Sequence, residues 1–460
     1  MPTAKNPEIR KVSHMPENNC NYSYKHIWTV AYPVLIGLLM EQLLGMTDTI
    51  FLGRVGEVEL GAAAIAGIFY MVINMIGFGF SIGAQIIIGR RNGEGNYNKI
   101  GHIFWQGLYF LLALALVMVT LSEWLSPHIL GAMISSPEVL DASLSYVKWR
   151  ILGLFFSFSS AMLQALYIGT THTKVLTWNS LAMVLSNICF NWVLIFGHFG
   201  LPALGIEGAA IGSTLSEIVS LAFLTVFTLL KFDRRKYGLD IRTGFDFKEF
   251  KDIMSISGWT MIQNFLSIFT WLIFFTLAEH LGEKQLAISN IVRNVSGTVW
   301  MIVMAFATTG STMISNLIGA GHPENVFPLL KKILKFCYSI VICWVILFFL
   351  FPTFFTRIFT NIPELVSDSV PALLTMAVSY LLSPAGAILF QAVSGTGNTK
   401  NSFLLESASL ATYFIFCLVT MGFLKADIAV CWLADSVYAL SLVLLCGTYL
   451  KSRKWMGKAL

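Results

Sequence analysis

Two acidic residues, Glu41 and Asp48, interrupt an apolar run that extends over residues 27–51. An ionised side chain near the centre of a bilayer costs at least about 2.5–3.5 kcal/mol, so an acid that is kept there usually has a function. Seven residues of helix return to nearly the same face, with a rise of about 10 Å. Both carboxylates can therefore face one internal cavity and bind a cation, which is H⁺ or Na⁺.

Two asparagines can complete such an ion-coupling site. Asn187 and Asn191 lie one helical turn apart in the apolar run 174–196, and side chains at this spacing share a face. Their amide oxygens and the Asp48 carboxylate are hard ligands, so these three residues form the expected metal site if the ion is Na⁺. The alternatives are an ion pair of Asp48 with Arg54 at the headgroups, a structural role for Glu41, and interhelical hydrogen bonds for the asparagines.

Other polar residues inside the apolar runs are candidates for a substrate cleft. Asp435 lies deep in the second half of the chain. It is a candidate to bind substrate or a proton, and the alternative is a packed, hydrogen-bonded acid with a structural role. Glu406 lies about one turn from the inner surface, where we expect it to be solvated. Arg293 either extends to the outer surface or faces the cleft. The remaining cleft candidates supply amide, soft or aromatic groups: Gln263, Asn264, Met301 and Tyr380.

The composition requires a lipid environment for the helices that carry these residues. Of 460 residues, 56% are hydrophobic and 12% are charged, and the mean hydropathy is +0.72, whereas a soluble chain is typically about 45–50% apolar and about 25% charged. The apolar runs are long and continuous, which favours helices over a barrel. The fold class expected is an all-α polytopic membrane protein.

Several functional classes are disfavoured. The net charge of +5 is spread over short loops, which argues against nucleic acid as a partner. Seven scattered cysteines without a CxxC pair predict neither a disulfide framework nor a zinc site. Eight histidines form no set with Asp or Ser at the membrane surface, so we expect no enzyme, no catalytic residues and no cofactor beyond a coupling ion. The first 26 residues lack the apolar stretch of a signal peptide and are expected to form a cytoplasmic tail.

Twelve apolar segments are long enough to cross a membrane. They cover residues 27–51, 60–88, 100–122, 140–168, 174–196, 206–230, 249–279, 285–315, 328–352, 365–394, 401–421 and 426–450. With the N-terminus inside, the inner segments carry 23 Lys and Arg residues and the outer loops carry four. This asymmetry predicts that both termini are cytoplasmic.

The chain repeats itself at a shift of 226 residues. Gly56-Glu57 returns as Gly282-Glu283, and Thr173-Lys174 returns as Thr399-Lys400. Each copy holds six spans, so the copies are parallel repeats, a common design among transporters. We expect two pseudo-symmetric lobes with a central cleft. The predicted parts are a tail (1–26), a first six-helix lobe (27–231), a cytoplasmic loop (232–248), a second lobe (249–450) and a second tail (451–460).

These segments resemble the multidrug and toxic compound extrusion (MATE) family over residues 27–450. The resemblance rests on "MTDTIFLGRVGEVELGAAAIAG", "GAQIIIGRRNGEGN", "SNICFNWVLIFGHFGLPALGIEGAAIGS" and "SGTGNTK", in this order. It implies two six-helix bundles in a V that exchange Na⁺ or H⁺ for cationic or amphipathic compounds. The family's ion-binding carboxylate falls on Asp48, and its polar partners fall on Asn187 and Asn191. A threonine early in the sixth helix matches Thr214, with Ser213 as the competitor.

The sequence departs from the Na⁺-coupled branch of that family in the second lobe. The seventh helix offers Gln263 and Asn264 where that branch has a glutamate, and the tenth-helix aspartate falls near Ser383. The chain is therefore more similar to the DinF-like branch, where coupling is assigned to the first lobe.

The leading functional hypothesis is a monomeric, ion-coupled antiporter in the inner or plasma membrane, which exports small drugs and toxins by alternating access. A lipid-linked oligosaccharide flippase would need a cationic cleft, for which the helices offer Arg293 alone at depth. A membrane-embedded enzyme and a channel are weaker alternatives.

Overall fold

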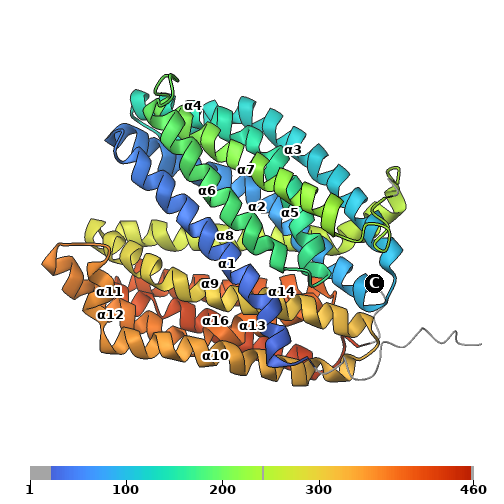
Figure 1. Ribbon diagram of the computed structural model, residues 1–460. Coiled ribbons are helices and arrows are strands. Elements are labelled where there is room, and N and C mark those ends of the chain that lie inside the picture. The colour runs from blue at the N-terminus through green and yellow to red at the C-terminus, as the bar shows by residue number, and fades with distance from the viewer. Residues whose placement is uncertain (1–21, 241–242, 457–460) are drawn as a thin grey trace, which may run out of the picture.

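The computed structural model describes residues 22–240 and 243–456, and it is built from helices (Figure 1). The first half contains α1 (Tyr24–Leu52), α2 (Glu57–Gly93), α3 (Tyr97–Met133), α4 (Pro137–Arg150), η2 (Ile151–Gly153), α5 (Leu154–Gly169), α6 (Lys174–Phe196) and α7 (Gly205–Lys231). The second half contains α8 (Phe247–Leu281), α9 (Glu283–Gly319), η3 (Pro323–Asn325), α10 (Val326–Leu350), α11 (Pro352–Arg357), α12 (Pro363–Ser379), α13 (Ser383–Gly395), α14 (Thr399–Cys417), the π-helical η4 (Leu418–Phe423), α15 (Ile428–Cys431) and α16 (Ala434–Lys451).

Local chemistry sets several of these boundaries. The Asp246 side chain caps α8 by accepting hydrogen bonds from the main-chain N–H groups of Lys248 and Glu249. Gly197 ends α6 in a left-handed conformation, with φ of 74°, which a residue without Cβ adopts at low cost. These signals sit next to the apolar runs, so the sequence places most helix ends to within a few residues.

Eleven helices of the described chain are long and apolar enough to cross a membrane, and one bent pair brings the number to twelve. The predicted all-α, twelve-span fold is therefore confirmed. The predicted span at 365–394 is present as a bent pair, in which α12 and α13 meet at an angle of 46°. Pro384 lies in the first turn of α13, where its missing N–H does not interrupt a helical hydrogen bond.

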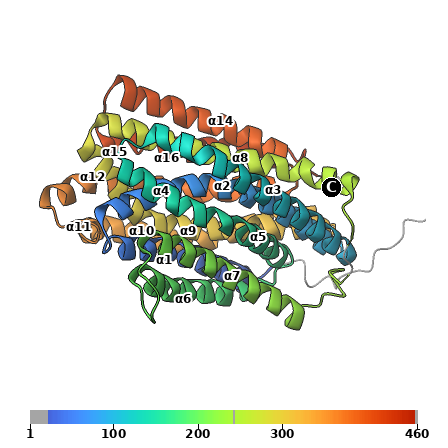
Figure 2. The same ribbon diagram turned by 90° about the horizontal axis from the view of Figure 1, so that it is seen from above.

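The repeat predicted from the sequence is present in the packing. We call α1–α7 the N-lobe and α8–α16 the C-lobe. In the N-lobe the Thr173 hydroxyl donates to the Thr29 carbonyl at 3.3 Å, and in the C-lobe the Thr399 hydroxyl donates to the Ile256 carbonyl at 3.0 Å. The same relation places α1 beside α6 and α8 beside α14, seen from above in Figure 2.

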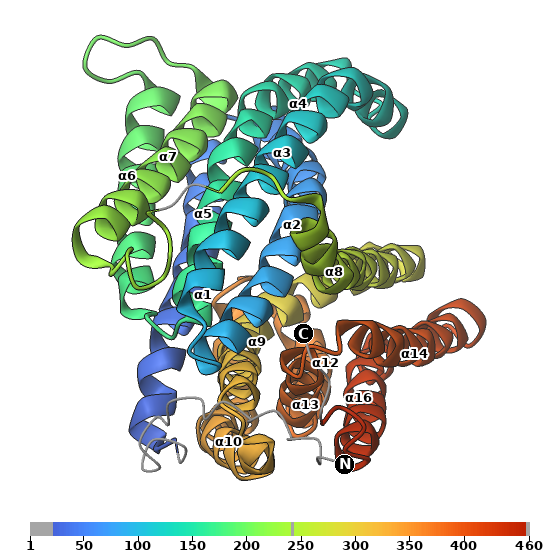
Figure 3. The same cartoon turned by 90° about the vertical axis from the view of Figure 1, so that its right-hand side faces the viewer.

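The first helix of each lobe begins in the other lobe. Ile27 and Ala31 at the start of α1 belong to the apolar core of the C-lobe, whereas Leu52 at its end belongs to that of the N-lobe. In the same way α8 starts in the N-lobe core with Ile253 and Ile256, and Figure 3 shows its first part beside α2. The predicted boundaries at 27–231 and 249–450 separate the two repeats along the sequence. In the packing, however, the first half of α1 lies in the C-lobe core and the first part of α8 lies in the N-lobe core.

Polar contacts join the lobes along α2 and α9, towards the end that the Lys and Arg distribution predicts to be cytoplasmic. We call this region the inner contact. Gln85 donates to the Thr312 hydroxyl at 2.7 Å, and the Asn92 amide donates to Asn316 at 2.6 Å. The Ser315 hydroxyl donates to the Ile86 carbonyl at 2.6 Å. At the opposite end of the described chain, no side-chain hydrogen bond crosses between the lobes. The structure is therefore closed on the inner side.

Candidate functional site

Asp48 lies inside the N-lobe as part of a polar network that joins α1, α6 and α7. Asn191 donates to one carboxylate oxygen at 2.5 Å, and the Ser213 hydroxyl donates to the other at 3.1 Å. Asn187 donates to Ser213 at 3.2 Å and accepts from Asn191 at 3.1 Å. The structure thus brings together Asp48, Asn187 and Asn191, which sequence spacing had singled out.

Close packing of α6 on α7 holds the asparagines in place. Both asparagines are fully buried, with 0% of their surface exposed. A side chain at Gly212 would overlap the Asn191 amide oxygen, and one at Gly208 would crowd the Leu194 carbonyl. Small residues at these two positions therefore allow the helices to approach closely enough for Asn191 to reach across to α1.

The network leaves one acceptor without a partner. The amide oxygen of Asn191 is buried and has no hydrogen-bond partner among the described residues. An unpaired buried acceptor is costly, whereas a carboxylate and amide oxygens together suit a hard monovalent cation. No group of three or more His, Cys, Asp or Glu residues in the described chain could hold a metal, so an ion here would be bound by Asp48 and the amides.

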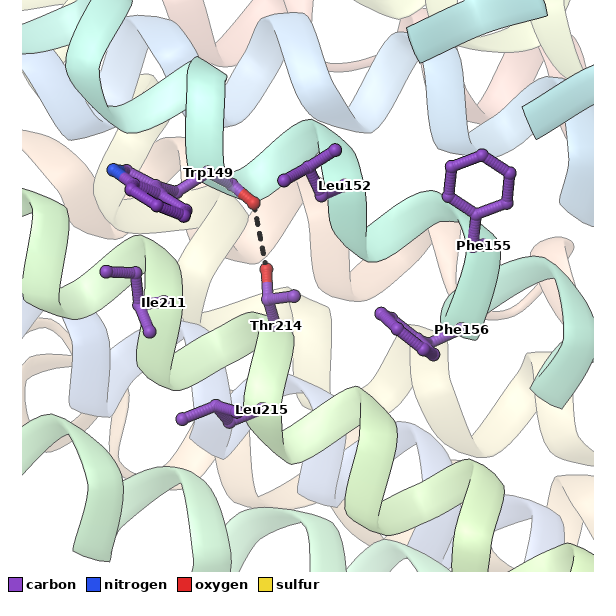
Figure 4. A pocket seen from close by; sticks show the side chains of 7 residues that line it. All are labelled: Trp149, Leu152, Phe155, Phe156, Ile211, Thr214 and Leu215. Atoms are coloured by element: carbon purple, nitrogen blue, oxygen red, sulfur yellow. Dashed lines mark hydrogen bonds between the residues drawn. The ribbon is translucent and has the colours of Figure 1, made fainter. Parts of the chain in front are cut away.

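Ser213, rather than Thr214, is the hydroxyl that contacts Asp48. Thr214 follows in the chain but points about 100° away around the helix, and its hydroxyl donates to the Trp149 carbonyl at 3.2 Å. It lines an apolar pocket of about 380 Å³ between α7 and the segment α4–η2–α5, with Leu152, Phe156 and Ile211 (Figure 4). The expectation for Thr214 is thereby corrected, because the two candidates differ by one residue and sequence alone does not fix the rotation of α7.

Glu41 does not join this network. Its side chain is exposed, and no hydrogen bond or ion pair links it to Asp48 within the described residues. It interacts electrostatically with Glu217 on α7. The alternative pairing of Asp48 with Arg54 is not formed either, since no ion pair between them is present in the described chain. The two acids of α1 therefore have different surroundings despite their shared helical face.

A buried ion pair next to the Asp48 network was not predicted. Arg150 on α4 donates to Glu217 on α7 at 2.8 Å, and Tyr70 on α2 donates to the same carboxylate oxygen at 3.1 Å. The guanidinium also lies 3.8 Å from the Tyr70 ring centroid. Glu217 stands one turn beyond Ser213 on α7. The sequence shows a basic and an acidic residue inside two different apolar runs. It does not show that these two side chains contact each other.

The C-lobe presents a different arrangement. Glu406, expected to be solvated, is only 4% exposed and accepts hydrogen bonds from Ser267 on α8 and Tyr438 on α16. That expectation is wrong because α8 and α16 cover α14 at this depth. The Asp435 carboxylate has no hydrogen bond within the described residues, and it interacts electrostatically with Tyr380 and Tyr413.

The remaining cleft candidates have structural contacts. Tyr380 is fully buried and donates to the Ser296 carbonyl at 2.6 Å, and Asn264 donates to the Thr260 carbonyl on its own helix. The Arg293 guanidinium lies 5.5 Å and 5.2 Å from the ring centroids of Trp271 and Phe275. Gln263 is buried, and its side-chain oxygen has no partner within residues 22–240 and 243–456. Met301 is half-buried. Ser383, near the tenth-helix position of the Na⁺-coupled branch, donates to the Ser379 carbonyl at 2.9 Å.

Comparison with known proteins gives a consistent result. The family model MatE matches residues 33–193 and 260–426. The chain is 24% identical to the probable multidrug resistance protein NorM of Thermotoga maritima over 97% of this chain and 96% of that protein. It is 23% identical to the multidrug resistance protein MdtK of Yersinia pseudotuberculosis, over 83% and 84%.

Solved structures share the fold. An outward-facing multidrug resistance MATE family transporter of the MOP superfamily superposes with a TM-score of 0.86 at 18% identity, covering 95% of this chain and 97% of that one. The eukaryotic MATE transporter AtDTX14 gives a TM-score of 0.82 at 19% identity, over 94% and 96%.

Proposed function

Because this chain belongs to the MatE family, we propose that it is an antiporter of the plasma membrane, which exports small organic molecules in exchange for H⁺ or Na⁺. It is an integral membrane protein, and its relatives NorM and MdtK are named as a probable multidrug resistance protein and a multidrug resistance protein. The observation that carries the proposal is the Asp48 carboxylate, held inside the N-lobe by Asn191 and Ser213. The proposal is a transporter rather than an enzyme.

The coupling step follows from the charge of Asp48. An ionised carboxylate in a poorly solvated interior is costly unless a positive charge compensates it. Binding of a cation removes that cost, so the loaded and empty states favour different arrangements of α1 against α6 and α7. A ligand shifts a conformational equilibrium by its difference in affinity for the two states.

The identity of the cation depends on the oxygens that surround Asp48. A proton needs only the carboxylate, whose existing hydrogen bonds then rearrange. Na⁺ needs further oxygens, which the unpartnered Asn191 amide oxygen and the Asn187 amide can supply. Assignment to the DinF-like branch stays a prediction, supported by Gln263 and Ser383 standing where the other branch has carboxylates.

Alternating access is supported by the way the lobes meet. The inner contact consists of neutral hydrogen bonds, such as those of Gln85 and Asn92, and each contributes only about 0.5–1.5 kcal/mol. Among the described residues no ion pair joins α2 to α9, so the opening of this contact breaks none there. We propose that the structure represents a state closed to the cytoplasm, with both termini on that side.

We propose that the substrates are cationic or amphipathic and that the protein works as a monomer. Three acids inside the lobes, Asp48, Glu406 and Asp435, have no ion-pair partner in the described chain, and a cationic substrate can compensate such charges. A flippase for anionic lipid pyrophosphates would need free cations. Arg293 instead packs against aromatic rings, and Arg150 is paired with Glu217.

The test is ethidium efflux from proteoliposomes, with a Na⁺ gradient and a pH gradient imposed separately. The wild type should accumulate or release ethidium in response to one of the gradients. Asp48→Asn should abolish this response with normal expression, whereas Asp141→Asn, which alters an exposed acid on α4, should not. Full gradient-driven transport by Asp48→Asn would remove Asp48 from the mechanism, and transport driven by neither gradient would refute cation coupling.

A further inference from the structure

Glu406 is a buried acid without a cationic partner. It lies on α14, between α8 and α16, with 4% of its surface exposed. No described Lys, Arg or His forms an ion pair with it, in contrast to Glu217, which is paired with Arg150. Its surroundings therefore do not stabilise a permanent negative charge in the way that Arg150 does for Glu217.

The hydrogen bonds at Glu406 satisfy only one of its two oxygens. The Ser267 hydroxyl donates to Oε1 at 2.7 Å, and the Tyr438 hydroxyl donates to the same atom at 3.2 Å. Oε2 is buried and has no hydrogen-bond partner among the described residues. Gln263, one turn from Ser267 on α8, is 6% exposed, and its buried Oε1 likewise has no partner in the part of the chain that the structure describes. Around Glu406 there are more hydrogen-bond acceptors than donors among the described residues, so a proton or a small cation can bind there.

Ser267 can serve Glu406 in both of its protonation states. Its hydroxyl oxygen also lies 2.9 Å from the Gln263 carbonyl oxygen of the preceding turn, and a hydroxyl has one hydrogen to donate. When Glu406 is ionised, Ser267 donates to the carboxylate. When Oε1 carries a proton, Glu406 donates to the Ser267 oxygen, and Ser267 turns its hydrogen to the Gln263 carbonyl.

We propose that Glu406 is a second proton-binding site, located in the C-lobe, with Ser267 as the hydroxyl that accommodates both the acid and the carboxylate. One proton from water converts the carboxylate to the acid, and no other bond changes. The site is separate from Asp48: Glu406 is seven residues from the inner start of α14, whereas Asp48 is four residues from the outer end of α1. Its role in transport rests on the proposed antiport function.

Few other ionisable groups face Glu406. α16 contributes Tyr438 and Cys446, which both interact electrostatically with it. α8 contributes the neutral Ser267 and Gln263, and neither α13 nor η4 contains an ionisable residue. A substitution of Glu406 alone should therefore remove the protonation signal of this residue and leave the signals of the other acids in place.

The direct test is acid-induced infrared difference spectroscopy of the purified full-length protein, because it does not depend on transport. Acidification between about pH 9 and pH 5 should produce a carboxylic acid carbonyl band that Glu406→Gln removes. Ser267→Ala should shift this band, since the acid loses its acceptor, and Glu364→Gln, an exposed acid on α12, should leave it unchanged. Absence of any band sensitive to Glu406→Gln overturns the proposal.

Two further measurements test whether the ion bound at Glu406 is H⁺ or Na⁺ and whether this site takes part in transport. Added Na⁺ at constant pH should not alter the band, and its loss on addition of NaCl would reassign the site to Na⁺ and overturn the proton assignment. In proteoliposomes, Glu406→Gln should lower the number of protons moved per ethidium by about one relative to Glu364→Gln. An unchanged ratio would exclude a part in coupling. Failure of the wild type to transport would refute the antiport function and leave the spectral result standing.

Discussion

Gly93 and Gly319 occupy equivalent positions in the two repeats, and each lies against the main chain of the other's helix. A Cβ atom at Gly93 would overlap the Asn316 carbonyl, and one at Gly319 would overlap the Arg90 carbonyl. The two glycines thus allow α2 and α9 to cross closely at the inner contact. The two repeats therefore contribute equivalent close approaches to the same contact.

A methyl group at this crossing should therefore disfavour the closed state. We expect Gly319→Ala to raise labelling of a cysteine placed at Ser315, which is 0% exposed, by a membrane-impermeant thiol reagent applied from the inner side. Gly297→Ala on the same helix has open space around it and should not change labelling. Equal labelling in both variants, in a background free of the seven native cysteines, would show that this crossing does not hold the inner side closed.

The neighbouring hydroxyls of α7 allow a matched test of the Asp48 network. Ser213→Ala removes a hydrogen bond to the carboxylate at 3.1 Å, and a hydrogen bond to a charged group contributes about 1.5–3 kcal/mol. We expect about a tenfold or greater change in the cation concentration that gives half-maximal ethidium transport. Thr214→Ala, which loses only its contact with the Trp149 carbonyl, should match the wild type. The assignment of Ser213 is wrong if the two variants behave alike.

The packing of α7 on α6 should control the position of the Asn191 amide. Gly212→Ala introduces a methyl group where the Asn191 amide oxygen lies, so the amide must move away from Asp48. Transport should fall several-fold, and the same assay of cation dependence should show weaker coupling. Gly67→Ala on α2, which has open space, is the control. Wild-type cation dependence of Gly212→Ala would mean that α6 and α7 adjust without moving Asn191.

The ion pair of Arg150 with Glu217 should matter for stability. The two side chains are 11% and 6% exposed, and removing one partner of a buried pair typically costs about 3–5 kcal/mol because the other charge is left uncompensated. Arg150→Met should therefore lower the unfolding temperature of the purified protein in detergent clearly. The double variant Arg150→Met with Glu217→Leu should recover much of the loss.

An exposed pair supplies the comparison for that experiment. Lys284 and Asp368 lie 2.5 Å apart but are 54% and 42% exposed, and solvent screens such pairs. Lys284→Met should leave the unfolding temperature nearly unchanged. Equal effects of Lys284→Met and Arg150→Met would indicate that the buried pair is no more important to stability than a surface contact.

The common orientation of the two asparagines on α6 was predictable from the sequence. Asn187 and Asn191 face the same side because four residues make about one turn of helix, and the structure places both beside Asp48. The apolar runs located the spans, since a bilayer leaves a helix as the simplest way to satisfy the main chain. The 226-residue repeat indicated two lobes, because duplicated sequences fold into similar units.

Contacts between helices were decided by the tertiary structure alone. The rotation of α7 selected Ser213 over Thr214, the approach of α4 to α7 paired Arg150 with Glu217, and α8 and α16 buried Glu406. The exchange of the first half-helices between lobes is likewise invisible in the sequence. The physical reason is that helical periodicity fixes angles within one helix, whereas the rotation and crossing of two helices depend on how their side chains pack.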